Sequence, residues 1–171
     1  MMDMFTECLL KRKRSFKEYL VIVPLAIIGV IGTLAYYIFL SATLLSGVGL
    51  AVVVLMWWGI YLLYSKNNLE FEYTVTNSDV DIDMIIAKRK RKRLMSFAAK
   101  DIQMMAPIGQ LGNEKFDKEI DASAHDDRFD VYFIDVKTRM GRTKILVNPS
   151  EKMLNILKTF RPQNIVIGEE K

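Results

Sequence analysis

The longest apolar stretch of the chain runs from Tyr19 to Tyr64 and contains no charged residue. A bilayer core of roughly 30 Å needs about 20 apolar residues in a helix, so the stretch is too long for one span and long enough for two. Ser41-Ala42-Thr43, a cluster of small and polar residues, divides it into segments 19–40 and 44–64. The pattern predicts two transmembrane helices joined by a tight turn.

Basic residues flank this stretch at its two outer ends. Lys11, Arg12, Lys13, Arg14 and Lys17 precede the first segment, Lys66 follows the second, and the short turn between them has no Lys or Arg. The positive-inside rule then predicts a cell-membrane protein with both termini in the cytoplasm. A cleaved signal peptide is the alternative, but its apolar region is only about 7–15 residues long and no second span follows it directly.

The head of the chain, residues 1–18, is basic and partly apolar. Phe5, Cys8, Leu9 and Phe16 recur at roughly helical spacing with basic residues between them, which predicts a short amphipathic helix on the inner leaflet. Disorder up to Lys11 is the alternative. Cys8 is the single cysteine, so no disulfide can form within the chain, and we interpret it as an apolar residue of the head.

Strict alternation of apolar and polar residues begins at Leu69, after a linker of four residues. Segments 69–76 and 79–87 both alternate, and Asn77-Ser78 between them is typical of a turn, so a β-hairpin is expected. Residues 108–128 form a long polar excursion that could hold a short helix or a further strand. Additional strands are predicted at 94–98, 101–106, 129–137 and 142–147.

The last helix is predicted from its start signal, Asn148-Pro149-Ser150-Glu151. Asn148 is expected to be the N-cap, Pro149 the first helical residue and Glu151 the third. The helix should run to about Phe160 with one apolar face, and 164–167 could add an edge strand. The fold class is therefore α+β: a helical membrane hairpin, then a small antiparallel barrel or sandwich over 69–168 that the helix closes.

This order of elements resembles the bacterial pleckstrin-homology-like (PH-like) domains, which often follow a pair of membrane spans. The matching stretch is Tyr73–Ile102: a Tyr-Thr-Val-Thr strand, a tight turn, an apolar strand, a basic turn, a strand, and Asp101-Ile102 opening the next. The whole chain also resembles small bacterial membrane proteins with two spans. One departure is that those domains commonly have glycine in the turn where this chain has a basic run. The resemblance implies the fold and little about a ligand.

Candidate catalytic and metal sites are weak. Glu70, Glu72, Asp79, Asp81 and Asp83 could serve as metal ligands or acid–base pairs, but their plain period of two is typical of a solvated strand face. His125 is the single histidine and lies in a polar loop, where solvation is the simpler interpretation. No Walker, dinucleotide or Gly-x-Ser-x-Gly pattern is present. We therefore expect a non-enzyme without cofactor or metal.

The basic run Lys88-Arg89-Lys90-Arg91-Lys92-Arg93 is the candidate binding site. If the first strand rises from the membrane at Leu69, the antiparallel second strand returns the turn after Ala87 to the membrane side. Six basic residues would then face anionic lipid headgroups, each contributing on the order of 1 kcal/mol. A solvated hairpin tip is the alternative interpretation of the same run.

These features predict a membrane-anchored cytoplasmic interaction module that binds a protein, an anionic lipid surface, or both. The chain carries a net charge of +4, but the part after Tyr64 is close to neutral, which argues against general nucleic-acid binding. An accessory subunit of a larger membrane complex is the main alternative, and an enzyme with an unfamiliar site is a third, weaker hypothesis.

Overall fold

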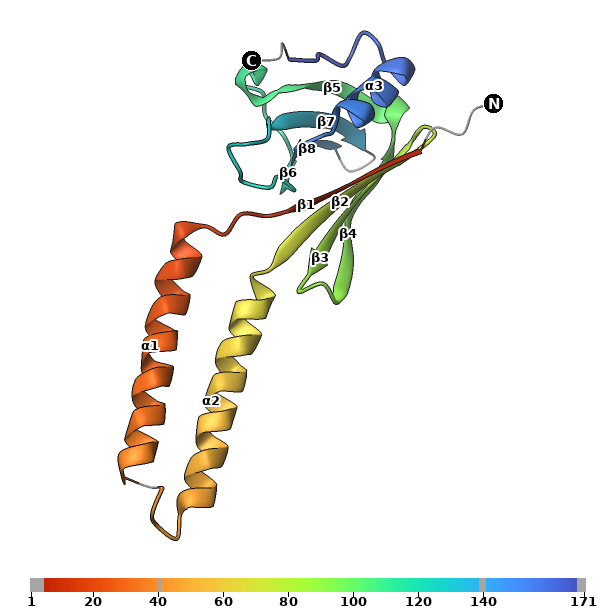
Figure 1. Ribbon diagram of the computed structural model, residues 1–171. Helices are drawn as coiled ribbons and strands as arrows, with labels where there is room; N and C mark the ends of the chain where they lie inside the picture. The colour runs from red at the N-terminus through yellow and green to blue at the C-terminus, as the bar shows by residue number, and fades with distance from the viewer. Residues whose placement is uncertain (1–4, 40, 139–140, 169–171) are drawn as a thin grey trace. The chain divides into compact units, whose positions relative to one another are not determined.

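The structure is a computed structural model that describes residues 5–39, 41–138 and 141–168. Its chain divides into two compact units (Figure 1). The helical unit runs from Arg14 to Asn68, and the other unit combines the chain up to Lys13 with the chain from Leu69 onward. Leu40, the expected last residue of the first span, and the centre of the expected turn 138–141 lie outside the described residues.

The helical unit is a hairpin of α1 (Phe16–Phe39) and α2 (Ser46–Lys66). Two stretches, Glu18–Phe39 and Ser46–Lys66, are long and apolar enough to cross a membrane by length and composition. These helices confirm the two apolar helices that the sequence predicts. Their bounds differ from the predicted ones by a few residues at either end.

Small residues of α1 let α2 approach closely. A Cβ atom on Gly29 would lie 3.0 Å from Cδ1 of Ile60 and 3.3 Å from the ring of Trp57. The Trp57 indole N–H donates to the Thr33 hydroxyl at 3.0 Å, and that hydroxyl donates to the Gly29 carbonyl at 2.8 Å. These bonds give the Trp57 indole N–H and the Thr33 hydroxyl partners within the helical hairpin, which a surrounding apolar medium could not supply.

The first sheet has four antiparallel strands in the order β1-β2-β3-β4 (Figure 1). They are β1 (Phe5–Lys11), β2 (Leu69–Thr76), β3 (Asp79–Ile86) and β4 (Lys90–Ala98). The hairpin of β2 and β3 confirms the prediction, and β4 begins earlier than expected because it takes in four of the basic residues.

β1 corrects the prediction for the head. Residues 5–11 form a strand paired with β2 along its whole length, and neither an interfacial helix nor disorder is present there. Thr6, Cys8 and Leu10 face the core side, opposite Val75, Tyr73 and Phe71. Phe5 and Leu9 lie on the opposite face but are also apolar, so the alternation of apolar and polar residues that is typical of a half-buried strand is not visible in this segment. The β-rich domain therefore begins before the helices and not at Leu69.

The second sheet has the order β5-β7-β8-β6 and includes one parallel pair, β6 with β8. Its strands are β5 (Ile102–Pro107), β6 (Lys118–Asp121), β7 (Tyr132–Thr138) and β8 (Gly141–Val147). The polar excursion thus holds a strand, and short 3-10 helices occupy Ala99–Asp101 and Ile108–Gln110. The predicted strand at 164–167 is reduced to one bridge between Ile165 and Met105.

The helix α3 (Glu151–Phe160) confirms the predicted C-terminal helix but not its cap. Ser150 is the N-cap, and its hydroxyl accepts the Met153 N–H at 3.3 Å. The Asn148 side chain is used elsewhere: it accepts the Ala124 N–H at 2.6 Å and donates to the carbonyls of Phe129 and Asp130. The prediction was wrong by two residues because these distant contacts claim the Asn148 amide.

Both sheets and α3 contribute to one hydrophobic core. Tyr73, Ile82, Ile134, Ile145 and Leu157 are completely buried in it. The α+β class is confirmed, whereas the two sheets do not close into a barrel.

Candidate functional site

The basic run begins in a tight turn whose backbone is unusual. Ala87 and Lys88 have φ angles of 53° and 57°, and the Arg89 N–H donates to the Ile86 carbonyl at 3.0 Å. Turns with two positive φ angles favour Asn and Gly, because a Cβ atom crowds the backbone at roughly 1–2 kcal/mol per residue. The chain therefore keeps a side-chain-bearing, basic residue here at a cost in stability.

The six basic residues do not act as one group. Only Lys88 and Arg89 belong to the turn, and the other four lie in β4, where side chains alternate between the two faces of the sheet. Arg91 and Arg93 lie opposite Ile85 and Asp83 on the outer face. Lys90 and Lys92 lie opposite Ile86 and Met84, and Met84 packs against the core side. All six residues are exposed, but only two of them belong to the turn and the other four are divided between the two faces of β4.

Carboxylates hold the arginines on the outer face. Arg91 contacts Glu72 at 2.6 Å, and Arg93 contacts Asp83 at 3.1 Å and Asp81 at 3.3 Å. The hydrogen bond to Asp83 raises the pKa of Arg93 above its ordinary value, and the charge of Asp81 adds to this effect. In the turn, Lys88 approaches Glu70 at 3.9 Å.

Three of the five carboxylates correct the prediction of a solvated strand face, whereas Asp79 is exposed and Asp81 is partly exposed. Glu70, Glu72 and Asp83 are only 8%, 6% and 4% exposed. They lie on the polar face of their strands but are covered there. Charges buried to this degree need cationic partners, and arginines of β4 lie beside Glu72 and Asp83. Within the described residues, no group of three or more His, Cys, Asp or Glu side chains is arranged to hold a metal ion.

One end of the first sheet gathers basic residues from two separate segments. Ile86 pairs with Leu69, the first residue of β2, and the Arg12 N–H donates to the Leu69 carbonyl at 2.9 Å. Lys11 pairs with Glu70 beside them. We call this the basic end; it comprises Lys11, Arg12, Lys13, Lys88, Arg89 and Lys90. Figure 1 shows the β3–β4 turn at the end of the sheet where β2 begins.

A loop after β6 fastens the chain at the basic end. The Lys13 N–H donates to the Ala124 carbonyl at 2.7 Å, and the Lys13 ammonium lies 4.0 Å from Asp126. Asp126 also binds Arg128, and the hydrogen bond from Arg128 lowers the pKa of Asp126 to about 2. The loop therefore fixes the point where the chain leaves the β-rich unit for α1.

His125 lies in the same loop with Asp121 and Ser123. The His125 Nε2 is 2.8 Å from Asp121, and the Ser123 hydroxyl donates to the other oxygen of Asp121 at 2.7 Å. Burial acts to raise the pKa of Asp121, but the bonds from Ser123 and the charge of His125 outweigh it, so this pKa is lowered. The hydroxyl points to the carboxylate and not to the imidazole, so the three side chains do not form an activated nucleophile.

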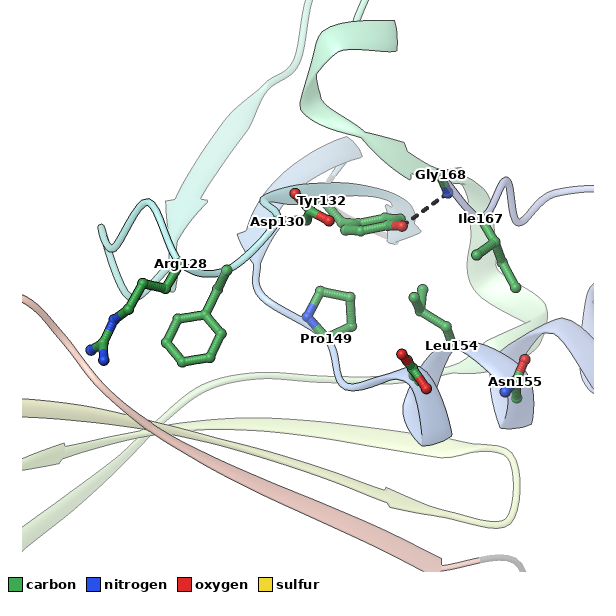
Figure 2. A pocket seen from close by; sticks show the side chains of 10 residues that line it. Arg128, Asp130, Tyr132, Pro149, Leu154, Asn155, Ile167 and Gly168 are labelled. Atoms are coloured by element: carbon green, nitrogen blue, oxygen red, sulfur yellow. Dashed lines mark hydrogen bonds between the residues drawn. The ribbon is translucent and has the colours of Figure 1, made fainter. Parts of the chain in front are cut away.

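A separate pocket of about 400 Å³ lies beside the start of α3 (Figure 2). Tyr132, Pro149 and Leu154 form its apolar centre, and Ile167 and Gly168 border it. The Gly168 N–H donates to the Tyr132 hydroxyl at 3.0 Å, which is the dashed line in Figure 2. The pocket could not be predicted from the sequence, because its walls come from three segments that lie far apart in the chain.

The chain from residue 2 to residue 167 matches the family described as Bacterial PH-like domain (DUF6106). This chain belongs to that family. The match includes β1 and both helices, so the two apolar helices lie within the family's pattern and not outside it. No curated protein and no solved structure matches the chain.

Of the residues that the sequence singled out, the structure of this PH-like protein brings some together and separates others. Lys88, Arg89 and Lys90 join Lys11–Lys13 at one end, a grouping that the sequence could not reveal without the β1 pairing. Arg91 and Arg93 are instead engaged in ion pairs.

Proposed function

We propose that this PH-like protein is a membrane-anchored, non-catalytic interaction module whose basic end docks on anionic lipid of the cytoplasmic leaflet. The observation that carries the proposal is the position of the chain connections. The chain leaves for α1 after Lys13, a residue of the basic end, and returns from α2 at Leu69, whose carbonyl accepts the N–H of Arg12 in the basic end. A domain tethered twice at one end must keep that end near the surface in which its helices are inserted.

Sidedness follows from the same strand pairing. β1 precedes α1 and pairs with β2, which follows α2, so both ends of the helical hairpin must emerge on one side of a bilayer. Within the helical unit, the Arg14 guanidinium lies 3.8 Å from the centre of the Tyr64 ring. This contact supports a hairpin whose entry and exit are at the same depth. The positive-inside rule, applied to the basic residues that flank the hairpin, supports the cytoplasm as that side.

Electrostatics supports docking on anionic lipid. Each basic residue near such a surface contributes about 1 kcal/mol, and the attraction falls off over a Debye length of about 8 Å at physiological salt. The basic end needs no long-range attraction, because the tether already holds it close and raises its effective concentration at the surface. Its carboxylates Glu70 and Asp126 reduce the net charge, so the docking should be reversible with salt.

The proposal is tested with the full chain in nanodiscs of neutral lipid or of neutral lipid mixed with phosphatidylserine. Amide hydrogen exchange around the turn, residues 86–90, should slow when phosphatidylserine is present and recover in high salt. The triple variant Lys88→Ser, Arg89→Ser and Lys90→Ser should lose this response.

A matched control removes the same charge elsewhere: Lys100→Ser, Lys152→Ser and Lys158→Ser, all exposed and outside the basic end. It should keep the response to phosphatidylserine. Two results would contradict docking by the basic end: hydrogen exchange in the parent chain that does not change with lipid charge, or a response that both triple variants lose equally.

A second candidate function is an accessory subunit of a larger membrane complex. A mainly apolar groove of about 370 Å³ lies between α1 and α2 near their connecting turn, bordered by Gly32, Tyr36, Val48 and Gly49 among others. Such a groove could receive a partner helix, because small residues let backbones approach. Co-purification in mild detergent tests it: a stoichiometric membrane partner that is lost on Gly49→Leu would favour the accessory role.

A further inference from the structure

Two cavities that share lining residues form a groove beside the start of α3 and the end of β5. The pocket of about 400 Å³ described above borders Asp130, Tyr132 and Gly168, and a cavity of about 200 Å³ borders the same three residues from the side of Pro107 and Ile108. Tyr132 and its hydrogen bond to Gly168 separate them. We call the pair the Tyr132 groove.

Apolar side chains are exposed around the Tyr132 groove. Ile108 and Phe129, which border one cavity each, are both 41% exposed, and Val166 beside Ile167 is 37% exposed. Large apolar side chains gathered at a concave surface, with polar residues around them, are typical of an interaction site.

The charge of the groove is negative. Asp130 borders both cavities and Glu151 borders the larger one, and both side chains are exposed without an ion-pair partner among the described residues. Arg128 does not balance them, because Asp126 holds its guanidinium at 2.7 and 3.1 Å. Figure 2 shows the Arg128 side chain turned away from Tyr132 and Leu154.

We propose that the Tyr132 groove binds an extended protein segment in which a Lys or Arg lies between two apolar residues. Alternate residues of an extended chain point to one side, so the two apolar side chains and the basic one face the groove together when each is separated from the next by one residue, the two apolar residues lying roughly 13 Å apart. The basic residue between them meets Asp130, and Glu151 adds to the attraction. This inference rests on the proposed interaction module and names the chemistry of its protein partner.

The charge pattern argues against an anionic ligand at this groove, so lipid headgroups and nucleic acid do not fit it. The negative charge also distinguishes the Tyr132 groove from the positively charged basic end. A domain docked on lipid through the basic residues would keep an acidic, apolar groove for a different partner, because complementary charge steers each surface to its own ligand.

The test uses the full chain in neutral-lipid nanodiscs and an array of short fluorescent peptides with a fixed leucine–x–arginine–x–leucine pattern, the x positions being varied. Binding is measured by fluorescence anisotropy. We expect members of the array to bind, and the same peptides with glutamate for arginine, or with glycine for both leucines, to bind at least about tenfold more weakly.

Variants locate the binding. Asp130→Asn with Glu151→Gln should weaken the arginine peptides about fivefold to tenfold and leave the glutamate peptides unchanged or improved. Phe129→Ser should weaken all leucine-containing peptides. The control Asp127→Asn removes an exposed carboxylate just outside the groove and should leave binding unchanged.

Two results would overturn the proposal: an array without a binding member, or binding that Asp130→Asn with Glu151→Gln leaves intact. Spermine that binds with the same dependence on these carboxylates, while no peptide does, would identify a small-cation site instead. The Lys88→Ser, Arg89→Ser, Lys90→Ser variant should bind the peptides normally, so failure of lipid docking and failure of peptide binding can be told apart.

Discussion

The hydroxyl of Tyr73 connects the two sheets of the PH-like domain inside their shared core. It donates to the Ala122 carbonyl, which follows β6, and it accepts the Asn148 N–H, which follows β8. Burial raises the pKa of Tyr73 well above its ordinary value, so the group remains a neutral donor over the whole physiological range. One phenol therefore satisfies two backbone groups that would otherwise be buried without partners.

Tyr73→Phe should lower the free energy of unfolding by about 1–3 kcal/mol, because it leaves the Ala122 carbonyl and the Asn148 N–H unpaired in the core. Tyr132→Phe is the matched control: it also removes one hydroxyl, but only the Gly168 N–H at the domain's edge loses a partner. Chemical unfolding of the full chain in detergent, followed by near-ultraviolet circular dichroism, measures both. Equal losses in the two variants would contradict the assigned role of Tyr73.

At the scale of elements, β1 decides how the domain is built. It covers the edge of β2 that would otherwise expose a row of unpaired backbone groups. Its pairing is non-local, since about sixty residues of helical hairpin separate the two strands in the chain. Alternation alone could not reveal it, because Leu9 and Leu10 place an apolar residue on each face.

Leu10→Ser should destabilise the PH-like domain by about 1–2 kcal/mol, because Leu10 packs against the core. Leu9→Ser should change stability by less than about 0.5 kcal/mol, since Leu9 is 55% exposed. Unfolding of the full chain in detergent compares the two. In an interfacial helix or a disordered head, neither change would affect the unfolding of this domain, so two silent variants would contradict β1.

β4 contains both the arginines that pair with buried carboxylates and Lys90, which belongs to the basic end. Replacing Arg91 and Arg93 by Ser should lower the melting temperature, because Glu72 and Asp83 would keep buried charges without their cations. Replacing Lys90 and Lys92 by Ser, an equal loss of charge in the same strand, should cost less than about 1 kcal/mol. Thermal unfolding of both pairs separates the structural arginines from the lysines; similar melting temperatures would contradict this division.

The sequence was sufficient for the elements whose signal is local. The two apolar helices follow from length and polarity, the β2–β3 hairpin follows from strict alternation around Asn77-Ser78, and α3 follows from its apolar face. The sequence was insufficient where contacts with a segment far away in the chain determine the local structure or the burial of a residue. Ser150 and not Asn148 caps α3, because the Asn148 side-chain amide binds Ala124 and Asp130. The carboxylates of β2 and β3 are buried because arginines of β4 cover them.

The whole molecule combines a helical hairpin with a domain whose chain connections and basic residues share one end. Sequence reasoning placed the β3–β4 turn on the membrane side from the length of the strands alone. The register of Leu69 with Ile86 confirms that the turn lies at the end where β2 begins. The contribution of Lys11–Lys13 to that end, and the existence of the Tyr132 groove, required the folded arrangement of segments far apart in the chain.

The central claim, docking by the basic end, is tested most directly by measuring how close two turns of the same sheet come to lipid headgroups. In a Cys8→Ser background, a fluorophore is attached at Ala87→Cys in the β3–β4 turn or at Ser78→Cys in the β2–β3 turn at the opposite end of the sheet. Both positions keep every charge of the basic end. Quenching by headgroup spin-labelled lipid is then compared in nanodiscs with and without phosphatidylserine.

The account predicts strong quenching at Ala87→Cys that phosphatidylserine increases and salt reduces, with little at Ser78→Cys. Equal quenching at the two positions, or stronger quenching at Ser78→Cys, would contradict it.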